Sequence, residues 1–195
     1  MDTNVRIQPR LGAWILLLAI FGSSPLHALH LSDYVASIDA RTKAIDQLPA
    51  REVKKALLTG TDGGGTLSAF WHDGEICHLK IVIGMSNRRV TNSYYYDHGR
   101  LIFALSEQAF FAWDKDAQKL DVNKTAITCE DKYYFADGKL TSWNTNRTGV
   151  DLSDHDSNIS KQNDTVSQQS SFFIKTAHQA GDSVNIESFI KRGTP

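Results

Sequence analysis

The chain has 195 residues, a formal net charge of −1 and 41% hydrophobic residues. So small a charge gives no bulk attraction to nucleic acid or to an anionic membrane surface. The apolar content is enough for a packed core, and the length is that of one ordinary domain.

The first 28 residues have the pattern of a secretory signal peptide. Arg6 and Arg10 precede an apolar run from Leu11 to Phe21, residues 22–25 (GSSP) break this run, and Ala28 supplies a small residue for cleavage. A positive start, a short apolar core and a small residue at the cleavage site define such a peptide. The run is shorter than the ~20 residues that span a bilayer, although an uncleaved anchor remains the alternative. We expect a periplasmic or secreted protein, cleaved after Ala28, with no stable membrane span afterwards.

Export changes how the two cysteines are interpreted. Cys77 and Cys129 are the only cysteines of the chain. An isolated pair in an oxidising compartment usually forms a disulfide, which would stabilise this chain by about 4 kcal/mol. Two separate buried thiols are the alternative, because a disulfide requires the two Cα atoms to lie close together.

A helix is predicted between Ser32 and Pro49. Val35, Ile38 and Ile45 recur at helical spacing, and proline ends or kinks a helix. Residues 51–58 favour a further short helical turn. The glycine-rich residues 59–65 then form a joint between helix and sheet, since the Lys-Ser/Thr of a phosphate loop does not follow them.

Three segments of the middle region share one pattern of bulky residues, a turn and an apolar residue. They are AFWHDGEI at 69–76, YYYDHGRL at 94–101 and YYFADGKL at 133–140, with Gly74, Gly99 and Gly138 at equivalent places. Asp-Gly between strand-forming runs predicts a two-residue hairpin turn, because that turn needs positive φ. The sequence therefore predicts an α+β fold, mainly antiparallel β. A meander of about six or seven strands follows an N-terminal helix and precedes a short C-terminal helix.

Strand alternation predicts two different faces of this sheet. Cys77, Leu79 and Ile81 share an apolar face, which the N-terminal helix is expected to cover. The opposite, wet face carries the candidate binding residues His78, Tyr95, Lys132 and Tyr134. Tyrosines contribute strongly to binding surfaces, although they also pack as cross-strand pairs or against helices.

The hairpin segments also carry a resemblance. YYYDHGRLIFA and YYFADGKLTSW, with GGGTLSAFWHDGEI and the helix before it, resemble a group of uncharacterised exported bacterial proteins. That group is built from repeated YYF-x-DGKL hairpins between short helices, and the resemblance covers residues 32–143. It implies export and a meander. Because its motifs specify turns and strands, it implies no reaction.

The composition changes after Trp143. Residues 145–171 are rich in polar side chains and predict an exposed or partly disordered linker, and Asp164 is the expected cap of a last helix that ends before Gly181. The predicted organisation is a signal peptide at 1–28, a helix plus meander at 29–143, and a polar linker with a C-terminal helix at 144–195.

Candidate chemical sites are few. Asp154, Asp156 and Asn158 match the first ligand positions of a calcium loop, but its glycine and its glutamate are missing. A metal site around the first turn would use His72, Asp73, Glu75 and His78, residue types that are also ordinary in turns. We therefore predict no metal, no cofactor and no catalytic residue.

Three function classes remain. The preferred one is a non-catalytic binding module for a protein or envelope component, such as an inhibitor, an immunity-type protein or an envelope factor; nucleic acid is not expected. A small-molecule or lipid carrier requires an apolar pocket inside the sheet. A hydrolase would use carboxylates such as Asp97, Glu130 and Asp131, which nothing in the sequence brings together.

Overall fold

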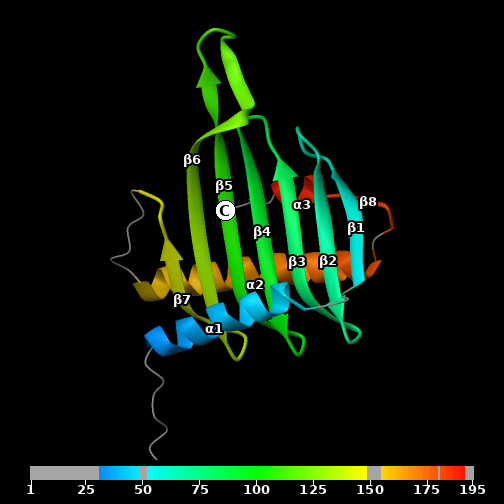
Figure 1. The fold of residues 1–195 in the computed structure, drawn as a ribbon, viewed down its shortest axis with the longest axis vertical. Helices are drawn as coiled ribbons and strands as arrows, with labels where there is room; N and C mark the ends of the chain where they lie inside the picture. The colour runs from blue at the N-terminus through cyan, green and yellow to red at the C-terminus, as the bar shows by residue number, and fades with distance from the viewer. Residues whose placement is uncertain (1–30, 49–51, 149–154, 180, 192–195) are drawn as a thin grey trace, which may run out of the picture.

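The structure, a computed structural model, describes residues 31–48, 52–148, 155–179 and 181–191. The predicted signal peptide lies outside these residues. The predicted α+β class is confirmed, with a largely antiparallel meander sheet between an N-terminal and a C-terminal helix (Figure 1).

Seven consecutive strands form the meander, and each pairs antiparallel with the next. They are β1 (Glu52–Thr59), β2 (Gly65–His72), β3 (Glu75–Gly84), β4 (Arg88–Asp97), β5 (Arg100–Asp114), β6 (Lys119–Ala136) and β7 (Lys139–Thr145). A short β8 (Ser183–Asn185) returns to pair parallel with β1. The sheet order is therefore the chain order, with one late strand added at the β1 edge.

The three two-residue turns have the same backbone conformation. Both central residues have positive φ at each turn: 48° at Asp137 and 76° at Gly138, with similar values at Asp73-Gly74 and His98-Gly99. Positive φ at both positions is the type I′ conformation, whose twist matches that of the flanking strands. The turns therefore hold the strand pairs in register at one end of the sheet.

Each of these hairpins also contains a β-bulge at the same place. The pairing shifts after Phe70, Tyr95 and Tyr134, so that the following strand has one more residue than the strand it pairs with at that point. These extra residues are Cys77, Ile102 and Thr141. Because of the bulge, the predicted alternation is wrong at the start of β3. Ile76 packs with Leu79 in the main core, and Cys77 is the extra residue of the bulge, between the two faces.

The predicted disulfide is wrong, since Cys77 and Cys129 are free thiols. Cys77 lies on β3 and Cys129 on β6, with β4 and β5 between them. Three strand spacings separate such residues by roughly 14 Å, far beyond the Cα separation of a disulfide. Cys129 is moreover in register, through Gln108 and Val90, with Ile83 rather than with Cys77.

The larger core lies between one face of the sheet and α2 (His155–Gln179), with α3 (Glu187–Lys191) beside it. Leu79, Ile81 and Ile83 are completely buried there, and Phe173 of α2 packs into the same cluster. Burial of this apolar area is the main stabilising term of the fold. The C-terminal helix, and not the N-terminal one, therefore covers the face that was predicted to be apolar.

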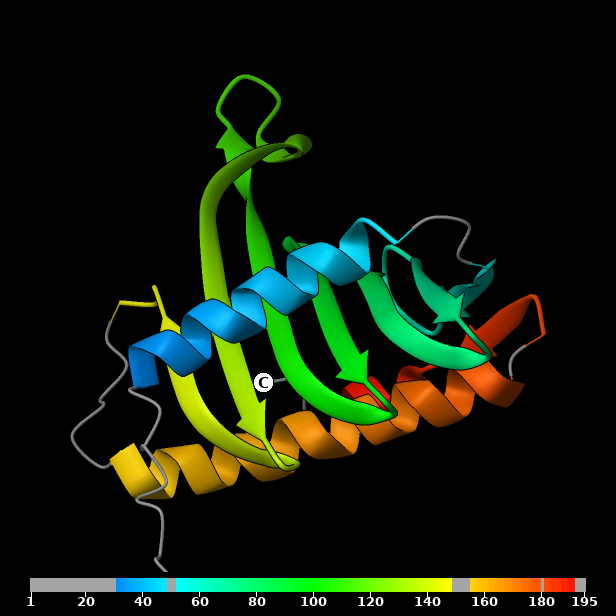
Figure 2. The same ribbon diagram turned by 60° about the horizontal axis from the view of Figure 1, so that its bottom comes forward.

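The opposite face is covered by α1 (Leu31–Asp46), as the turned view shows (Figure 2). Ile38 is the one residue of this helix that is fully buried, and Val35 and Ile45 are half-buried against the same small cluster. Both helices cross the strands near the end that carries the turns (Figures 1 and 2). The predicted wet face is thus half covered, and the protein has three layers.

Two segments differ from their predictions because contacts with distant parts of the chain outweigh their local preferences. Residues 52–59 form β1 rather than helix, because pairing with β2 and β8 outweighs the helix propensity of this Lys-, Ala- and Leu-containing segment. The polar tract after residue 145 is largely helical, since α2 begins at His155 rather than near Asp164. Its polar side chains bind the sheet: Asn163 Oδ1 accepts a hydrogen bond from the Leu140 N–H at 2.9 Å.

One residue, Asn146, closes the edge of β6 at Thr128 and Glu130. Beyond the end of β7, the Asn146 N–H donates to the Glu130 carbonyl at 3.1 Å, and Asn146 Oδ1 accepts from the Glu130 N–H at 2.6 Å. Asn146 Nδ2 also donates to the Thr128 carbonyl at 3.4 Å. Asn146 therefore occupies the backbone groups of Glu130 and the carbonyl of Thr128 that another strand would use at this part of the edge.

The turn conformation predicts the effect of a β-branched residue. We expect Gly138→Val to lower the free energy of unfolding by roughly 1–3 kcal/mol, because valine is strained at positive φ. Gly181→Val is the matched control: an added Cβ meets nothing within 4 Å at either position, and Gly181 lacks the positive φ. Urea unfolding curves measure both changes, and equal losses in the two variants would contradict the turn geometry.

The free thiols give a second expectation. Thiol titration of the denatured, unreduced protein should find both cysteines reactive, and a reductant should leave the melting temperature unchanged. A Cys129→Ser variant serves as the control, since it should lose one reactive thiol and keep its insensitivity to reductant. A melting temperature that falls by several degrees on reduction would contradict this arrangement.

Candidate functional site

A row of five rings crosses the sheet on the face that α1 covers. Its members, one from each of β2 to β6, are Phe70, His78, Tyr95, Phe103 and Tyr134, and each is in register with the next. His78 is stacked between Phe70 and Tyr95, with ring centroids at 4.9 Å and 4.2 Å. The remaining neighbours are tilted, at 5.8 Å and 5.1 Å. Cross-strand ring pairs of this kind stabilise a sheet.

This ring row contains most of the predicted binding residues, but α1 lies over it. Tyr95, Tyr134 and His78 keep only 8%, 2% and 5% of their surface exposed. The fourth predicted residue, Lys132, stays at the surface with its Nζ 3.0 Å from Glu130 Oε1. The structure therefore brings three of the four together, in a helix–sheet contact rather than on an open surface.

Polar groups make much of the contact between α1 and the ring row. The Tyr95 hydroxyl donates to Asp46 Oδ2 at 3.0 Å, and the Tyr134 hydroxyl donates to Asp39 Oδ1 at 3.3 Å. His78 Nδ1 lies 3.4 Å from the second carboxylate oxygen of Asp46. Carboxylates of α1 thus receive the polar ends of rings whose bodies are buried, as amphipathic side chains require.

The tyrosines of the opposite face bind α2 in the same way. The Tyr94 hydroxyl donates to Gln169 Oε1 at 3.0 Å, and the hydroxyls of Tyr96 and Ser170 are 2.8 Å apart. Burial raises the pKa of Tyr94 and Tyr96 well above the ordinary value of 10.0. On the α1 side, burial raises the pKa of Tyr134 to about 12, and the nearby Asp39 carboxylate adds to this rise. These phenols are protonated at neutral pH and make structural hydrogen bonds.

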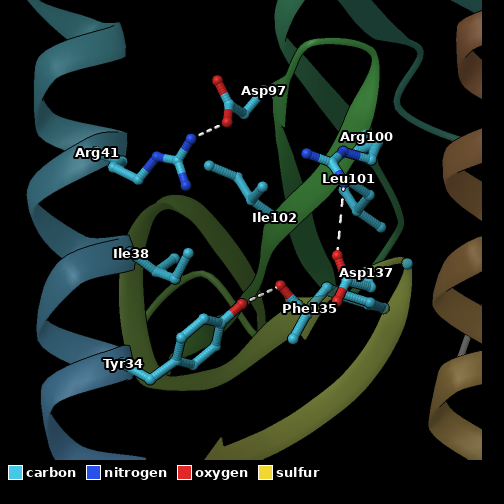
Figure 3. Close-up of a pocket in the computed structure, with 11 residues that line it drawn as sticks. Tyr34, Ile38, Arg41, Asp97, Arg100, Leu101, Ile102, Phe135 and Asp137 are labelled. Carbon is cyan, nitrogen blue, oxygen red and sulfur yellow. Dashed lines mark hydrogen bonds and ion pairs between the residues drawn. The ribbon is translucent and has the colours of Figure 1, made fainter. Parts of the chain in front are cut away.

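A cleft of about 190 Å³ opens between α1 and the turns that follow β4 and β6 (Figure 3). Apolar side chains line part of it, among them Ile38, Leu101 and Ile102. The Tyr34 hydroxyl reaches from α1 across the cleft and donates to the Phe135 carbonyl. Three segments distant in the sequence therefore meet around one small hollow.

Charged groups of both signs stand in the walls of this cleft. Arg41 of α1 forms an ion pair with Asp97 at the end of β4, and both side chains are partly exposed. Arg100 Nη1 lies 3.5 Å from Asp137 Oδ1, across the two turns. The walls thus contain two guanidinium groups and two carboxylates, and their formal charges balance.

A second distinctive surface is the long end of the β5–β6 hairpin. β4 pairs with β5 only as far as Phe110, and residues 111–127 continue as a two-stranded projection, which we call the ribbon (Figure 1). Trp113, Val122 and Ile127 are 56%, 54% and 62% exposed on it. These are half of the large apolar side chains found exposed in the described part of the chain. Exposed apolar residues gathered on one element mark an interaction surface.

Local hydrogen bonds shape the tip of the ribbon. Asp114 Oδ1 accepts from the backbone N–H groups of Asp116 and Ala117 at 2.9 and 3.0 Å, and Gln118 has a positive φ of 51°. Three aspartates and three lysines lie within residues 111–127, so the ribbon has no net charge. Its apex is polar, and its apolar side chains stand below that apex. The turn and alternation patterns of the sequence do not predict this surface; the Phe-Phe-Ala-Trp run at 110–113 is the signal that marks it.

The carboxylates proposed for a hydrolase do not gather. Asp97 pairs with Arg41, Glu130 with Lys132, and Asp131 with Arg147, whose Nη2 lies 2.6 Å from Asp131 Oδ2. Across the described residues, no group of three or more His, Cys, Asp or Glu side chains could hold a metal ion. The calcium-loop residue Asp154 lies outside the described residues, and Asp156 and Asn158 fall within α2.

No helix among the described residues is long and apolar enough to cross a membrane. Comparison of the chain with protein-family models, with curated proteins and with solved structures found no match. The resemblance of the hairpin segments to exported bacterial proteins therefore stays a prediction.

The buried phenols predict a loss of stability at alkaline pH. Between the ordinary tyrosine pKa of 10.0 and the pKa of about 12 at Tyr134, the unfolded chain releases a proton that the folded protein keeps. The free energy of unfolding should therefore fall as pH rises through this interval. Denaturant unfolding across it provides the measurement, and Tyr134→Phe should give a shallower pH dependence. Identical slopes in the variant and the wild type would contradict the assignment to Tyr134.

Proposed function

We propose that this chain is a non-catalytic, exported binding module that engages a protein of the envelope or the extracellular space through the ribbon. The observation that carries the proposal is the exposure of Trp113, Val122 and Ile127 on an element that contributes little to the core. A two-stranded ribbon alone is marginally stable in water, so a projection this long and apolar is best explained by a partner.

The distribution of side chains on the ribbon favours a protein partner over a lipid surface. Lys115, Asp116 and Lys119 occupy its apex and would have to enter the bilayer first. Apolar residues bordered by polar ones are instead the usual anatomy of a protein interface, with tryptophan prominent among the residues that dominate the binding energy.

The rest of the molecule supports binding rather than catalysis. The carboxylates suggested for a hydrolase are each engaged by a basic side chain at separate places on the sheet. Helices pack against both faces of the sheet near its turns, and the rings there are occupied with helix contacts. The fold thus acts as a rigid base that presents the ribbon.

Site-specific cross-linking tests this proposal. A photoreactive benzoyl-phenylalanine placed at Trp113 of the exported protein should give a discrete larger adduct in the envelope or medium. The same group at Lys175, an exposed residue of α2, should not. Ile127→Ser should reduce the yield at position 113 several-fold without changing the melting temperature, because its side chain is exposed. Equal adducts at both positions would refute the ribbon as the binding surface.

Affinity gives a second readout once the cross-linked partner is identified. Trp113→Ala should weaken binding to that partner by at least tenfold, since truncating a central tryptophan typically costs about 2 kcal/mol or more. Lys175→Ala is the control and should leave the affinity unchanged. Unchanged affinity of the Trp113→Ala protein would show that the contact is incidental.

A further inference from the structure

We propose that the cleft beside α1 binds a small zwitterion, namely a free α-amino acid with an apolar side chain of about the size of leucine. The cleft lies at the turn end of the sheet, and the ribbon projects from the opposite end (Figure 1). The inference is therefore independent of the function proposed for the ribbon.

The size of the cleft sets the size of the ligand. Its volume of about 190 Å³ corresponds to about six water molecules at ~30 Å³ each. Sites for drug-sized ligands and cofactors are larger, at roughly 300–1,000 Å³. A free amino acid can lie wholly within this space, whereas most of a nucleotide or a lipid chain would lie outside it.

The apolar lining selects the kind of side chain. Leu101 and Ile102 follow the β4–β5 turn, and Ile38 faces them from α1 (Figure 3). Ile102 is the extra residue of its β-bulge, so the same irregularity that all three hairpins contain places it in the α1 cluster at this point. An aliphatic ligand group would exclude water from these side chains.

The balanced charges of the walls select a zwitterion over a singly charged ligand. A guanidinium group has five N–H donors, and Arg41 and Arg100 each use only part of that set on an aspartate. A ligand carboxylate can bind the remaining donors, and Asp97 or Asp137 can accept from a ligand ammonium group. A ligand with only a carboxylate would compete with the aspartates for the arginines and leave an aspartate less well neutralised. A ligand with only an ammonium group would leave an arginine less well neutralised.

A ligand that takes over partners in the ion pairs of the cleft disturbs the fold little. The side chains of Arg100 and Asp137 are 64% and 93% exposed, and the side chain of Arg41 is half exposed. Ion pairs at such positions contribute little to stability. Ligand charges can therefore replace or join these contacts without unfolding α1 or the turns.

Calorimetric titration of the exported protein tests the inference with three probes of one shape. L-leucine has both charges, N-acetyl-L-leucine has only the carboxylate, and L-leucinamide has only the ammonium group. We expect leucine to bind at least tenfold more tightly than either of the others. Equal binding of the three, or no binding of leucine, valine or phenylalanine at millimolar concentration, would overturn the inference.

Variants locate the binding. Arg41→Gln and Asp97→Asn should each weaken leucine binding at least tenfold, whereas Arg89→Gln, an exposed arginine near the other end of β4, should not. If Arg41→Gln proves unfolded by circular dichroism, Arg100→Gln replaces it, because that side chain lies on an exposed turn. Leucine affinity unchanged in both Asp97→Asn and Arg100→Gln would place the ligand elsewhere and overturn the assignment.

Discussion

Three consecutive tyrosines of β4 hold both helices to the sheet. Strand alternation sends the hydroxyls of Tyr94 and Tyr96 to α2 and the hydroxyl of Tyr95 to α1. A buried hydroxyl without a partner costs about 1–3 kcal/mol, so each ring fixes the helix residue that satisfies it. A shift of β4 by one position would exchange all three partners, and the positions of the helices therefore depend on the register of this strand.

The elements that local chemistry specifies were predictable from the sequence. Asp137-Gly138 and the equivalent pairs favour type I′ turns, and the spacing of Val35, Ile38 and Ile45 favours a helix. The errors concern contacts between distant residues. β1 becomes a strand only through its pairing with β2 and β8, and the bulge at Cys77 and the lack of a disulfide depend on the arrangement of the whole meander.

The candidate sites were likewise predictable where local sequence decides their placement, and not where contacts between distant residues decide it. His78, Tyr95 and Tyr134 were correctly placed on one face, but periodicity cannot tell which helix covers that face. The cleft is formed by α1 and two turns that are distant in the sequence, so no local motif predicts it. The ribbon depends on the unequal lengths of neighbouring strands: β4 begins only at Arg88, opposite Phe110, whereas β5 and β6 extend beyond this pair. Strand ends are the least predictable part of a sheet.

Asn146 limits how a partner strand could bind to this fold. Since its amide and backbone already bond the exposed edge of β6 at Thr128 and Glu130, an incoming strand finds no continuous main-chain edge there. A strand therefore cannot be added to β6 at the base of the ribbon. Under the proposed function, the exposed side chains of the ribbon would carry the recognition. Because Trp113 and Val122 lie outside the buried core, they can be exchanged at little cost to folding. If the ribbon binds the proposed partner, specificity and stability are encoded in separate sets of residues, and selection can act on each alone.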